Sequence, residues 1–350
     1  MRNCPGCLKE GHDTYCLPCR RRLFGGKKVS HVLSFSRPFY NQAKLSVTAA
    51  RLSISGIQTK MSLALRDGRL EITETGGRYI LKPIPHGEFK HLDAAPINEH
   101  LTMQIARQLF GIAVAENALV AFDDGELAFL VRRFDVQDDG SRSLQEDFAQ
   151  LAGRAEETHG QYYKYDFSYE EIGDLIRKHV AAYPVCMERF FSLVVFNYLI
   201  NNGDAHIKNF SLIRNDEYGD YTLTPAYDLL NTRLHVPDEA RTALELFKDD
   251  FKTDSYEANA FYAFDDFREL AMRLGLREKR FGRIMQAFID NENAVGSLVD
   301  RSALSEECKQ IYKSHVHDSI KALSYSYAGH LGKNAKDIRG AAPRPRRRKP

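Results

Sequence analysis

The stretch Asn201-Asn-Gly-Asp204-Ala-His206-Ile-Lys208-Asn209-Phe210 decides the fold and the chemistry of this chain. It follows an apolar run over residues 185–201 that is typical of a buried helix, yet it is itself too polar to belong to a core. Asp204 and Asn209, five positions apart in such a loop, suit phosphoryl transfer. The Asp orients an attacking hydroxyl and accepts its proton, while the Asn binds a magnesium that bridges phosphate oxygens.

This chemistry requires a second carboxylate on the metal, and Asp228 supplies it nineteen residues after Asn209, in Pro225-Ala-Tyr-Asp228. Taken singly, residues 202–204 could be a helix C-terminal turn and Asp228 a helix cap, and each of these plain interpretations would be favoured. Their order, and the kind of segments around them, favour the catalytic interpretation.

Periodicity outward from this loop predicts a small β-rich lobe followed by a larger helical lobe, with a ligand cleft between them. An Asp67-Gly68 turn predicts a hairpin, and Gly111 is placed to stop the helix that begins at Pro96. The expected strands are 61–66, 69–73, 79–84, 113–122, 127–134, 210–213 and 221–224, and the expected helices are 96–109, 169–180, 185–201 and most of 256–324.

The upstream stretch over residues 53–60, Ser-Ile-Ser-Gly-Ile-Gln-Thr-Lys, could cover triphosphate oxygens, although its single Gly matches no phosphate-loop signature. Lys82 on an expected strand and Glu99 on the following helix stand in the order of the lysine–glutamate pair of protein kinases. The alternatives are a strand lysine whose ammonium reaches water and a first-turn helix carboxylate. The pair alone does not decide between them.

The composition is that of a globular protein. The chain has 350 residues, of which 43% are hydrophobic and 27% charged, and this excludes a mainly disordered chain. The net charge of +2 hides an acidic body of −10 over residues 31–332 between a +5 N-terminus and a +7 tail, residues 333–350. No apolar run is long enough to span a membrane, and no signal peptide is visible. We expect a cytoplasmic protein whose tail, rich in Pro and Arg, is disordered.

Four of the six cysteines, Cys4, Cys7, Cys16 and Cys19, form two CxxC pairs separated by eight residues. Each pair can bind one side of a tetrahedral zinc, so the pattern predicts a metal knuckle. An iron–sulfur cluster or a redox pair remains the alternative. His12 is a spare ligand candidate, and the isolated Cys186 and Cys308 have no expected role.

The segments SISGIQTK, YILKP, NEH, VRRFD, QED, NGDAHIKNF and TPAYD occur in the order seen in the HipA family of bacterial toxin–antitoxin serine/threonine kinases. They span roughly residues 50–232. The lack of a further β-rich domain before Ser53 resembles HipT, the short form whose missing subdomain is a separate small protein. The resemblance implies an α+β, two-lobed, protein-kinase-like fold. The expected parts are a knuckle (1–30), a small β-rich lobe (31–140), a helical lobe (141–330) and a basic tail (331–350).

The resemblance further implies that Asp204 is the catalytic base and that Asn209 and Asp228 bind magnesium. Autophosphorylation would fall on Ser53 or Ser55. It would be inhibitory because a phosphate beside the triphosphate position repels nucleotide. Arg132 stands where HipA has an acidic residue, but a hinge receives adenine through backbone groups. The implied nucleotide site comprises Ser55, Gly56, Ile57, Gln58, Thr59, Lys60, Lys82, Glu99, Arg132, Arg133, Phe134, His206, Ile207, Lys208 and Tyr227.

The implied function is that of an ATP- and Mg2+-dependent toxin kinase that phosphorylates a serine of an aminoacyl-tRNA synthetase, tryptophanyl or glutamyl. The implied partners are a helix-turn-helix antitoxin and a small HipS-like protein. The chain would contact DNA through the antitoxin, which would place it at the nucleoid, or directly through the basic tail. The alternatives are a non-catalytic, kinase-shaped regulator that binds antitoxin and operator DNA, and a small-molecule kinase on the same fold.

Overall fold

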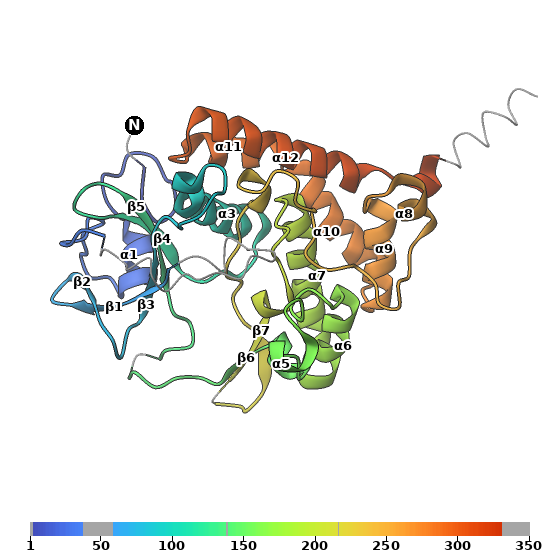
Figure 1. Cartoon of the computed structure of the whole chain (residues 1–350), viewed down its shortest axis with the longest axis horizontal. Helices are drawn as coiled ribbons and strands as arrows, with labels where there is room; N and C mark the ends of the chain where they lie inside the picture. Colours follow the sequence, from blue (N-terminus) through green and yellow to red (C-terminus); the bar gives the residue numbers. More distant parts are fainter. Residues whose placement is uncertain (1–2, 38–58, 138, 216, 331–350) are drawn as a thin grey trace, which may run out of the picture.

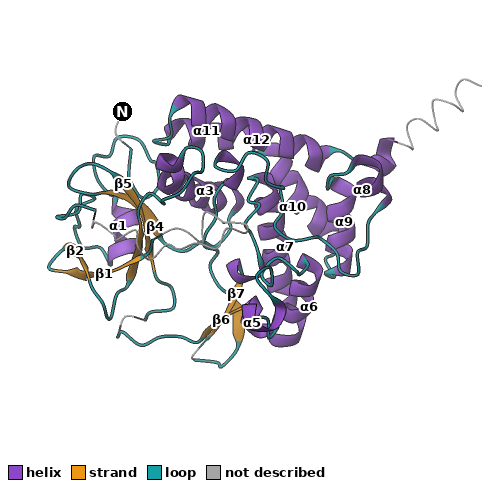
Figure 2. Cartoon of the chain, viewed as in Figure 1, coloured by secondary structure: helices purple, strands orange, loops and turns teal. Residues whose placement is uncertain are grey.

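The computed structural model describes residues 3–37, 59–137, 139–215 and 217–330. Residues 53–58, which hold the loop serines, and the basic tail therefore lie outside the described residues. Figures 1 and 2 show a β-rich part beside a larger helical part, as expected for a two-lobed α+β chain. The described helices include none that is both long and apolar enough to cross a membrane.

The small lobe is built, in its described residues, on an antiparallel sheet of order β2-β1-β3-β5-β4. Asp67 and Gly68 both have positive φ, 47° and 78°. The predicted hairpin turn is therefore present, and it has the backbone conformation that Asp-Gly pairs adopt more easily than most residues. The strands are β1 (Met61–Arg66), β2 (Arg69–Ile72), β3 (Tyr79–Lys82), β4 (Asn117–Ala121) and β5 (Leu127–Arg132).

The start of β4 differs from the sequence prediction, which began this strand at residue 113. Val114 instead forms an isolated bridge with Ala226, and Ala115 N donates to Ala226 O at 2.9 Å. Residues 113–115 thus tie the small lobe to the segment that carries Asp228, a non-local pairing that local periodicity does not reveal.

Helix α3 (Ala95–Phe110) packs against β4 and β5 and ends at Gly111, which adopts the left-handed conformation with φ 62°. Pro96 lies at its start, where the missing N–H costs nothing. Every residue from Ala95 to Ala106 is buried, because the helix lies between the sheet and the helical lobe (Figure 1). The predicted helix is confirmed, and it places Glu99 inside the molecule.

The helical lobe surrounds α7 (Tyr183–Leu199), which contacts α6, α10 and α12 and carries a continuous run of buried residues. A second sheet of order β6-β7-β8 lies beside it. Strand β6 was not predicted, since its three residues carry no periodicity of their own. The remaining elements are β6 (Gln145–Asp147), α4 (Phe148–Leu151), α5 (Glu156–His159), α6 (Tyr169–His179), η3 (Ile207–Asn209), β7 (Ser211–Arg214), β8 (Tyr221–Leu223), η4 (Thr232–Leu234), α8 (Asp254–Asn259), α9 (Phe264–Arg273), α10 (Glu278–Asp290), α11 (Glu292–Arg301) and α12 (Glu306–Ser324), with η2 (Leu92–Ala94) leading into α3.

The cysteine knuckle is part of the small lobe's core. Its second CxxC pair opens a helix, α1 (Leu17–Phe24), that the sequence analysis did not predict. Leu23 and Phe24 of this helix share one hydrophobic cluster with the buried faces of β1, β3, β4 and β5. All six cysteines lie in the described residues, and none of them forms a disulfide there.

Candidate active site

Lys82, the last residue of β3, links the small lobe to the segment that carries Asp228. Its ammonium lies 2.6 Å from Oε1 of Glu99 on α3 and also bonds Oδ1 of Asp228. The side chain is buried, with 5% of its surface exposed. The structure therefore brings together Lys82, Glu99 and Asp228 from three separate segments, and the strand-lysine and helix-glutamate arrangement is present.

The charges of this cluster are strongly coupled. Burial opposes ionisation of Asp228, but the positive charges of Lys82 and Lys60 outweigh it and hold the carboxyl pKa well below its usual range. Burial raises the pKa of Glu99 to about 7, although Lys82 opposes the shift. Despite its burial, Lys82 keeps its proton because two carboxylates face it, and its pKa is raised. Asp228 is thus the ionised carboxylate of the cluster and Glu99 the more easily protonated one.

The loop of residues 201–210 is held rigidly at the end of α7. Asn201 ends the helix in the left-handed conformation, φ 56°, and donates to Ser319 Oγ on α12 at 2.9 Å. Gly203 N donates to Thr232 Oγ1 at 2.8 Å. This anchoring explains how a polar loop can start at the edge of a core: distant segments satisfy the polar groups of Asn201 and Gly203 at its beginning.

Asp204 is 3% exposed and accepts a hydrogen bond of 2.7 Å from Tyr165 Oη at Oδ1. His206 Nε2 lies 3.9 Å from the same oxygen. Burial lowers the pKa of His206 to about 3, so its ring is neutral at physiological pH. Tyr165 was missed by the sequence analysis; it lies 39 residues before Asp204, and no spacing rule links the two.

Asn209 presents a buried amide oxygen. The side chain is 8% exposed, and its Oδ1 finds no hydrogen-bond partner among the described residues. An amide oxygen and the Asp228 carboxylate are the hard oxygen ligands that magnesium prefers. Asp228 itself has φ 54°, in the left-handed region that Asp tolerates better than most residues. The donor set fits a magnesium site.

Two contacts hold the Asp228 segment against the loop. Asn202 Nδ2 lies 3.5 Å from Asp228 O, and Tyr227 Oη donates to Lys208 O at 3.0 Å. Lys208 in turn donates to Asp147 Oδ2 on β6 at 2.9 Å. Asn202 and Asp147 are therefore structural members of the site that sequence reasoning did not name as site residues.

The expected hinge, residues 132–134, begins at the last residue of β5. Arg132 N donates to Glu116 O at 2.7 Å, and Arg133 N donates to Arg78 O at 2.8 Å, while the Arg133 guanidinium pairs with Asp135. The Phe134 ring stacks on Tyr227 with centroids 5.9 Å apart. The structure thus brings hinge and Asp228 segment together through an aromatic pair. Of the expected phosphate loop, the structure describes only Thr59 and Lys60; Ser53, Ser55, Gly56, Ile57 and Gln58 lie outside the described residues.

A cavity of about 610 Å³ opens beside the loop. Tyr165 and Gly203 line it from the loop side, and residues 236–245 line the other. Three carboxylates contribute to its wall, those of Asp238, Glu239 and Glu245, and among the described residues no Lys or Arg lines it. The cavity is therefore an acidic recess next to the hydrogen-bond partner of Asp204.

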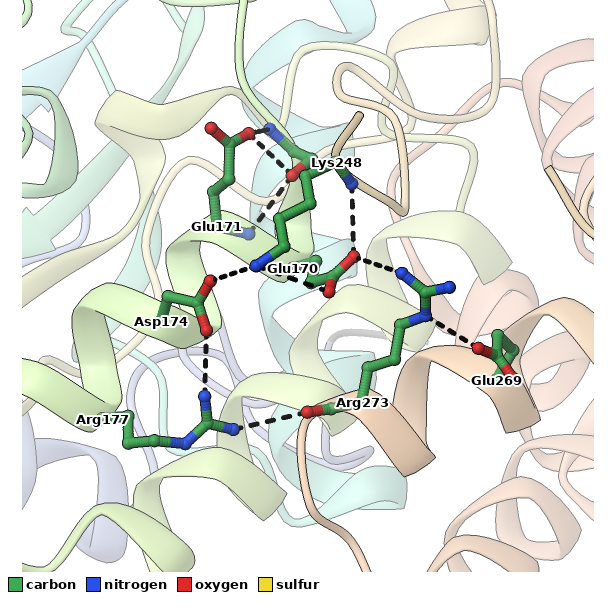
Figure 3. A network of polar contacts seen from close by, with 8 residues as sticks. Glu170, Glu171, Asp174, Arg177, Lys248, Glu269 and Arg273 are labelled. Carbon is green, nitrogen blue, oxygen red and sulfur yellow. Dashed lines mark hydrogen bonds and ion pairs between the residues drawn. The ribbon is translucent and has the colours of Figure 1, made fainter. Parts of the chain in front are cut away.

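Figure 3 shows an ion-pair network in which Lys248, three residues after Glu245 of the recess wall, contacts helix α6, which also contacts Arg273 of α9. Lys248 Nζ bonds Asp174 Oδ2 at 2.9 Å, and its backbone N donates to Glu170. Arg273 bonds Glu170 at 3.1 Å, and its guanidinium lies 3.9 Å from the ring centroid of Phe251. Glu170 N also donates to Leu246 O, so helix α6 holds residues 246–251 in place.

Gly203→Ala is expected to destabilise the loop. A Cβ at this position would meet Ala240 O at 2.3 Å and Glu239 Cγ at 2.6 Å, so the wall of the recess would have to move. We expect the free energy of unfolding to fall by about 1–3 kcal/mol in denaturant titration. Gly282→Ala on α10, where a Cβ meets nothing within 4 Å, is the matched control and should be neutral or slightly stabilising. Equal effects of the two changes would contradict the close packing at Gly203.

Comparisons with known proteins agree with this geometry. A HipA-like C-terminal domain matches residues 52–295. A Haemophilus influenzae protein whose name is a provisional kinase assignment is 31% identical over 269 residues, covering 69% of this chain and 73% of that protein. A Sinorhizobium fredii protein with the same kind of name is 34% identical over 248 residues, 66% of this chain and 56% of its own.

Solved structures show the same fold. HipA of Shewanella oneidensis, determined with HipB and operator DNA, superimposes with a TM-score of 0.62 at 21% identity, over 86% of this chain and 70% of that one. The Helicobacter pylori proinflammatory kinase CtkA gives a TM-score of 0.51 at 15% identity, over 79% and 97%. The family match covers well over half of the chain, and the site residues from Lys82 to Asp228 lie within it. The chain belongs to the family of proteins with a HipA-like C-terminal domain.

Proposed function

We propose that this chain is an ATP-dependent protein serine/threonine kinase that acts as the toxin of a toxin–antitoxin system. The observation that carries the proposal is the buried Lys82 held between Glu99 and Asp228. Asp204 and the Asn209 amide oxygen, which has no partner among the described residues, lie in the adjoining loop. A binding module has no need of this combination, whereas phosphoryl transfer uses each of its members.

In the proposed reaction, the hydroxyl oxygen of the acceptor serine bonds the γ-phosphorus of ATP, and ADP leaves. Asp204 Oδ2 accepts the proton that this hydroxyl loses. Tyr165 holds Asp204 in one orientation through its 2.7 Å hydrogen bond. Lys82 positions phosphate oxygens, and Arg132, Arg133 and Phe134 receive the adenine. Magnesium, when bound by Asn209 and Asp228, neutralises charge between the phosphates.

The remaining nucleotide contacts are proposals from the family pattern. Ser55, Gly56, Ile57, Gln58, Thr59 and Lys60 would cover the triphosphate, with Ser53 or Ser55 as the site of inhibitory autophosphorylation. Lys60 supports this role, because its charge acts on both Asp228 and Glu99. The site would be completed on the helical-lobe side by His206, Ile207, Lys208 and Tyr227.

The acidic recess beside Tyr165 supports a protein acceptor rather than a small molecule. Its 610 Å³ hold several side chains, and its three carboxylates favour an acceptor serine flanked by Lys or Arg. We propose an aminoacyl-tRNA synthetase, tryptophanyl or glutamyl, as the substrate. A helix-turn-helix antitoxin is proposed by analogy with the HipB–DNA complex of the Shewanella protein; a small HipS-like companion on the small lobe is a further proposal.

The test is incubation with labelled ATP and magnesium, alone and with each purified synthetase, followed by mapping of phosphoserines. We expect label on a synthetase serine and on Ser53 or Ser55. Acceptor peptides with Lys beside the serine should be phosphorylated faster than matched peptides with Glu there. Absence of label on any protein, with nucleotide bound, would favour the non-catalytic regulator instead.

A further inference from the structure

The four cysteine sulfurs fit a zinc ion. Their Sγ atoms all lie within 4.8 Å of one another, and Cys7 Sγ lies 3.7 Å from Cys16 Sγ. Tetrahedral zinc with Zn–S distances of about 2.3 Å sets its sulfurs about 3.8 Å apart. Cys16 N donates to Cys4 Sγ at 3.2 Å, so a backbone amide already faces one thiolate position. The donor set and its spacing are those of a structural zinc site.

The helix that this site anchors reaches the strand of Lys82. Leu23, in the last turn of α1, accepts a hydrogen bond of 2.8 Å from Tyr79 Oη. Tyr79 begins β3, the strand that ends at Lys82. The Phe24 ring packs on the Tyr79 ring with centroids 5.8 Å apart. The position of β3 therefore depends on where α1 ends.

The same helix end contacts the hinge. Arg132, the last residue of β5, donates from Nη1 to Arg22 O at 2.8 Å. The Arg22 side chain pairs with Glu116 at 3.2 Å, and Glu116 also accepts from Arg107 on α3 at 2.8 Å. One turn of α1 thus contacts the hinge and connects to the helix of Glu99.

The first CxxC pair adds contacts on the other side. Cys7 O accepts from Gln108 on α3 at 3.0 Å, and Pro5 O accepts from Leu119 N on β4 at 2.9 Å. A Cβ at Gly6 would lie 2.9 Å from Cys19 Sγ, so the two pairs pack directly on each other. An eight-residue helix is too short to hold its own shape in water, and the metal is what would join it to the first pair.

We propose that zinc bound by Cys4, Cys7, Cys16 and Cys19 sets the nucleotide affinity of this chain, by fixing α1 against β3 and the hinge. The inference rests on the proposed function for the identity of the nucleotide site. Loss of zinc separates α1 from the first cysteine pair, so that only its packing on the sheet still holds it, and the hydrogen bonds from Tyr79 and Arg132 weaken together. The lysine strand and the hinge then lose a shared support, although no zinc ligand touches nucleotide.

The experiment measures zinc content and affinity for a non-hydrolysable ATP analogue with magnesium, by mass spectrometry of metals and by calorimetry. The full chain is stripped with a zinc-selective chelator and exchanged into chelator-free buffer before magnesium is added. We expect one zinc per chain as purified, about tenfold weaker nucleotide binding after stripping, and recovery on addition of zinc. A folded, stripped chain with unchanged affinity would overturn the proposal, as would iron in place of zinc.

A second variant decides the matter if the stripped chain unfolds. Tyr79→Phe with Arg132→Met removes both hydrogen bonds to α1 and leaves the cysteines intact. It should keep one zinc and bind nucleotide about fivefold more weakly. Tyr15→Phe, which removes a buried bond from the knuckle to Leu119 O on β4, is the control and should bind as wild type. Wild-type affinity of the double variant would refute the role of α1.

The two proposals fail separately. If the zinc-loaded chain binds nucleotide but phosphorylates no protein, the kinase proposal fails and the zinc inference stands. If the chain phosphorylates a protein and binds nucleotide equally with and without zinc, the zinc inference fails and the kinase proposal stands.

Discussion

Asp204→Asn is expected to reduce protein phosphorylation about 10²- to 10⁴-fold, the contribution typical of a general base, while nucleotide binding stays near wild type. Asn keeps the side-chain oxygen that accepts from Tyr165 Oη, so the loop should keep its shape. His206 cannot replace the lost base, because burial lowers its pKa to about 3 and leaves the ring weakly basic. Labelled phosphate transfer and calorimetric nucleotide binding, measured on the same preparation, check this result.

Two further variants locate the effect. Asp166→Asn changes an exposed neighbour of Tyr165, bound to Arg154 at the surface, and should leave transfer unchanged. Tyr165→Phe keeps the ring and removes the hydroxyl, so it should lower kcat about tenfold with little change in the nucleotide KM. Transfer by Asp204→Asn within a few fold of wild type would rule out Asp204 as the base.

Local signals in the sequence predicted those parts of the site whose geometry is local. The turn residues Asp67 and Gly68 set the first hairpin, and Gly111 sets the end of α3, because each adopts a backbone conformation that few other residues tolerate. Once these elements were placed, Lys82 and Glu99 followed by order along the chain. Their contact at 2.6 Å is the consequence of packing α3 on the sheet.

Other parts of the fold and of the site depend on pairing between distant segments, which no local sequence pattern indicates. Strand β6 exists because β7 pairs with it, with Glu146 opposite Leu212. Tyr165 reaches Asp204 because residues 160–166 fold back over the loop, where Ile207 N donates to Lys164 O. Helix α1 is short and has no side-chain cap, and it is held by the sheet and by the cysteine site. Periodicity within one segment cannot encode such contacts.

Lys82→Met is expected to have the largest combined effect, on stability and on nucleotide binding. The ammonium is buried between two carboxylates, Glu99 and Asp228, so its removal leaves negative charge without compensation in the core. Breaking one partner out of a buried ion pair costs about 3–5 kcal/mol, and we expect the free energy of unfolding at pH 7 to fall by that amount. Calorimetric nucleotide binding should be lost at the same time, because the variant lacks the phosphate-positioning cation.

The pH dependence of this loss distinguishes the ion pairs from a simple packing defect. The pKa of Asp228 is lowered in the folded chain, so its stabilising contribution is present above the ordinary carboxyl pKa and is lost as the pH falls through the folded value. The stability difference between wild type and Lys82→Met should therefore be largest near neutrality and should narrow in acid. Lys313→Met, which removes the half-buried partner of the exposed Asp300, is the matched control and should cost less than about 1 kcal/mol. A loss at Lys82 that stays constant from pH 7 into the acid range would mean that the methylene packing of the side chain, rather than its charge between Glu99 and Asp228, holds the two lobes together.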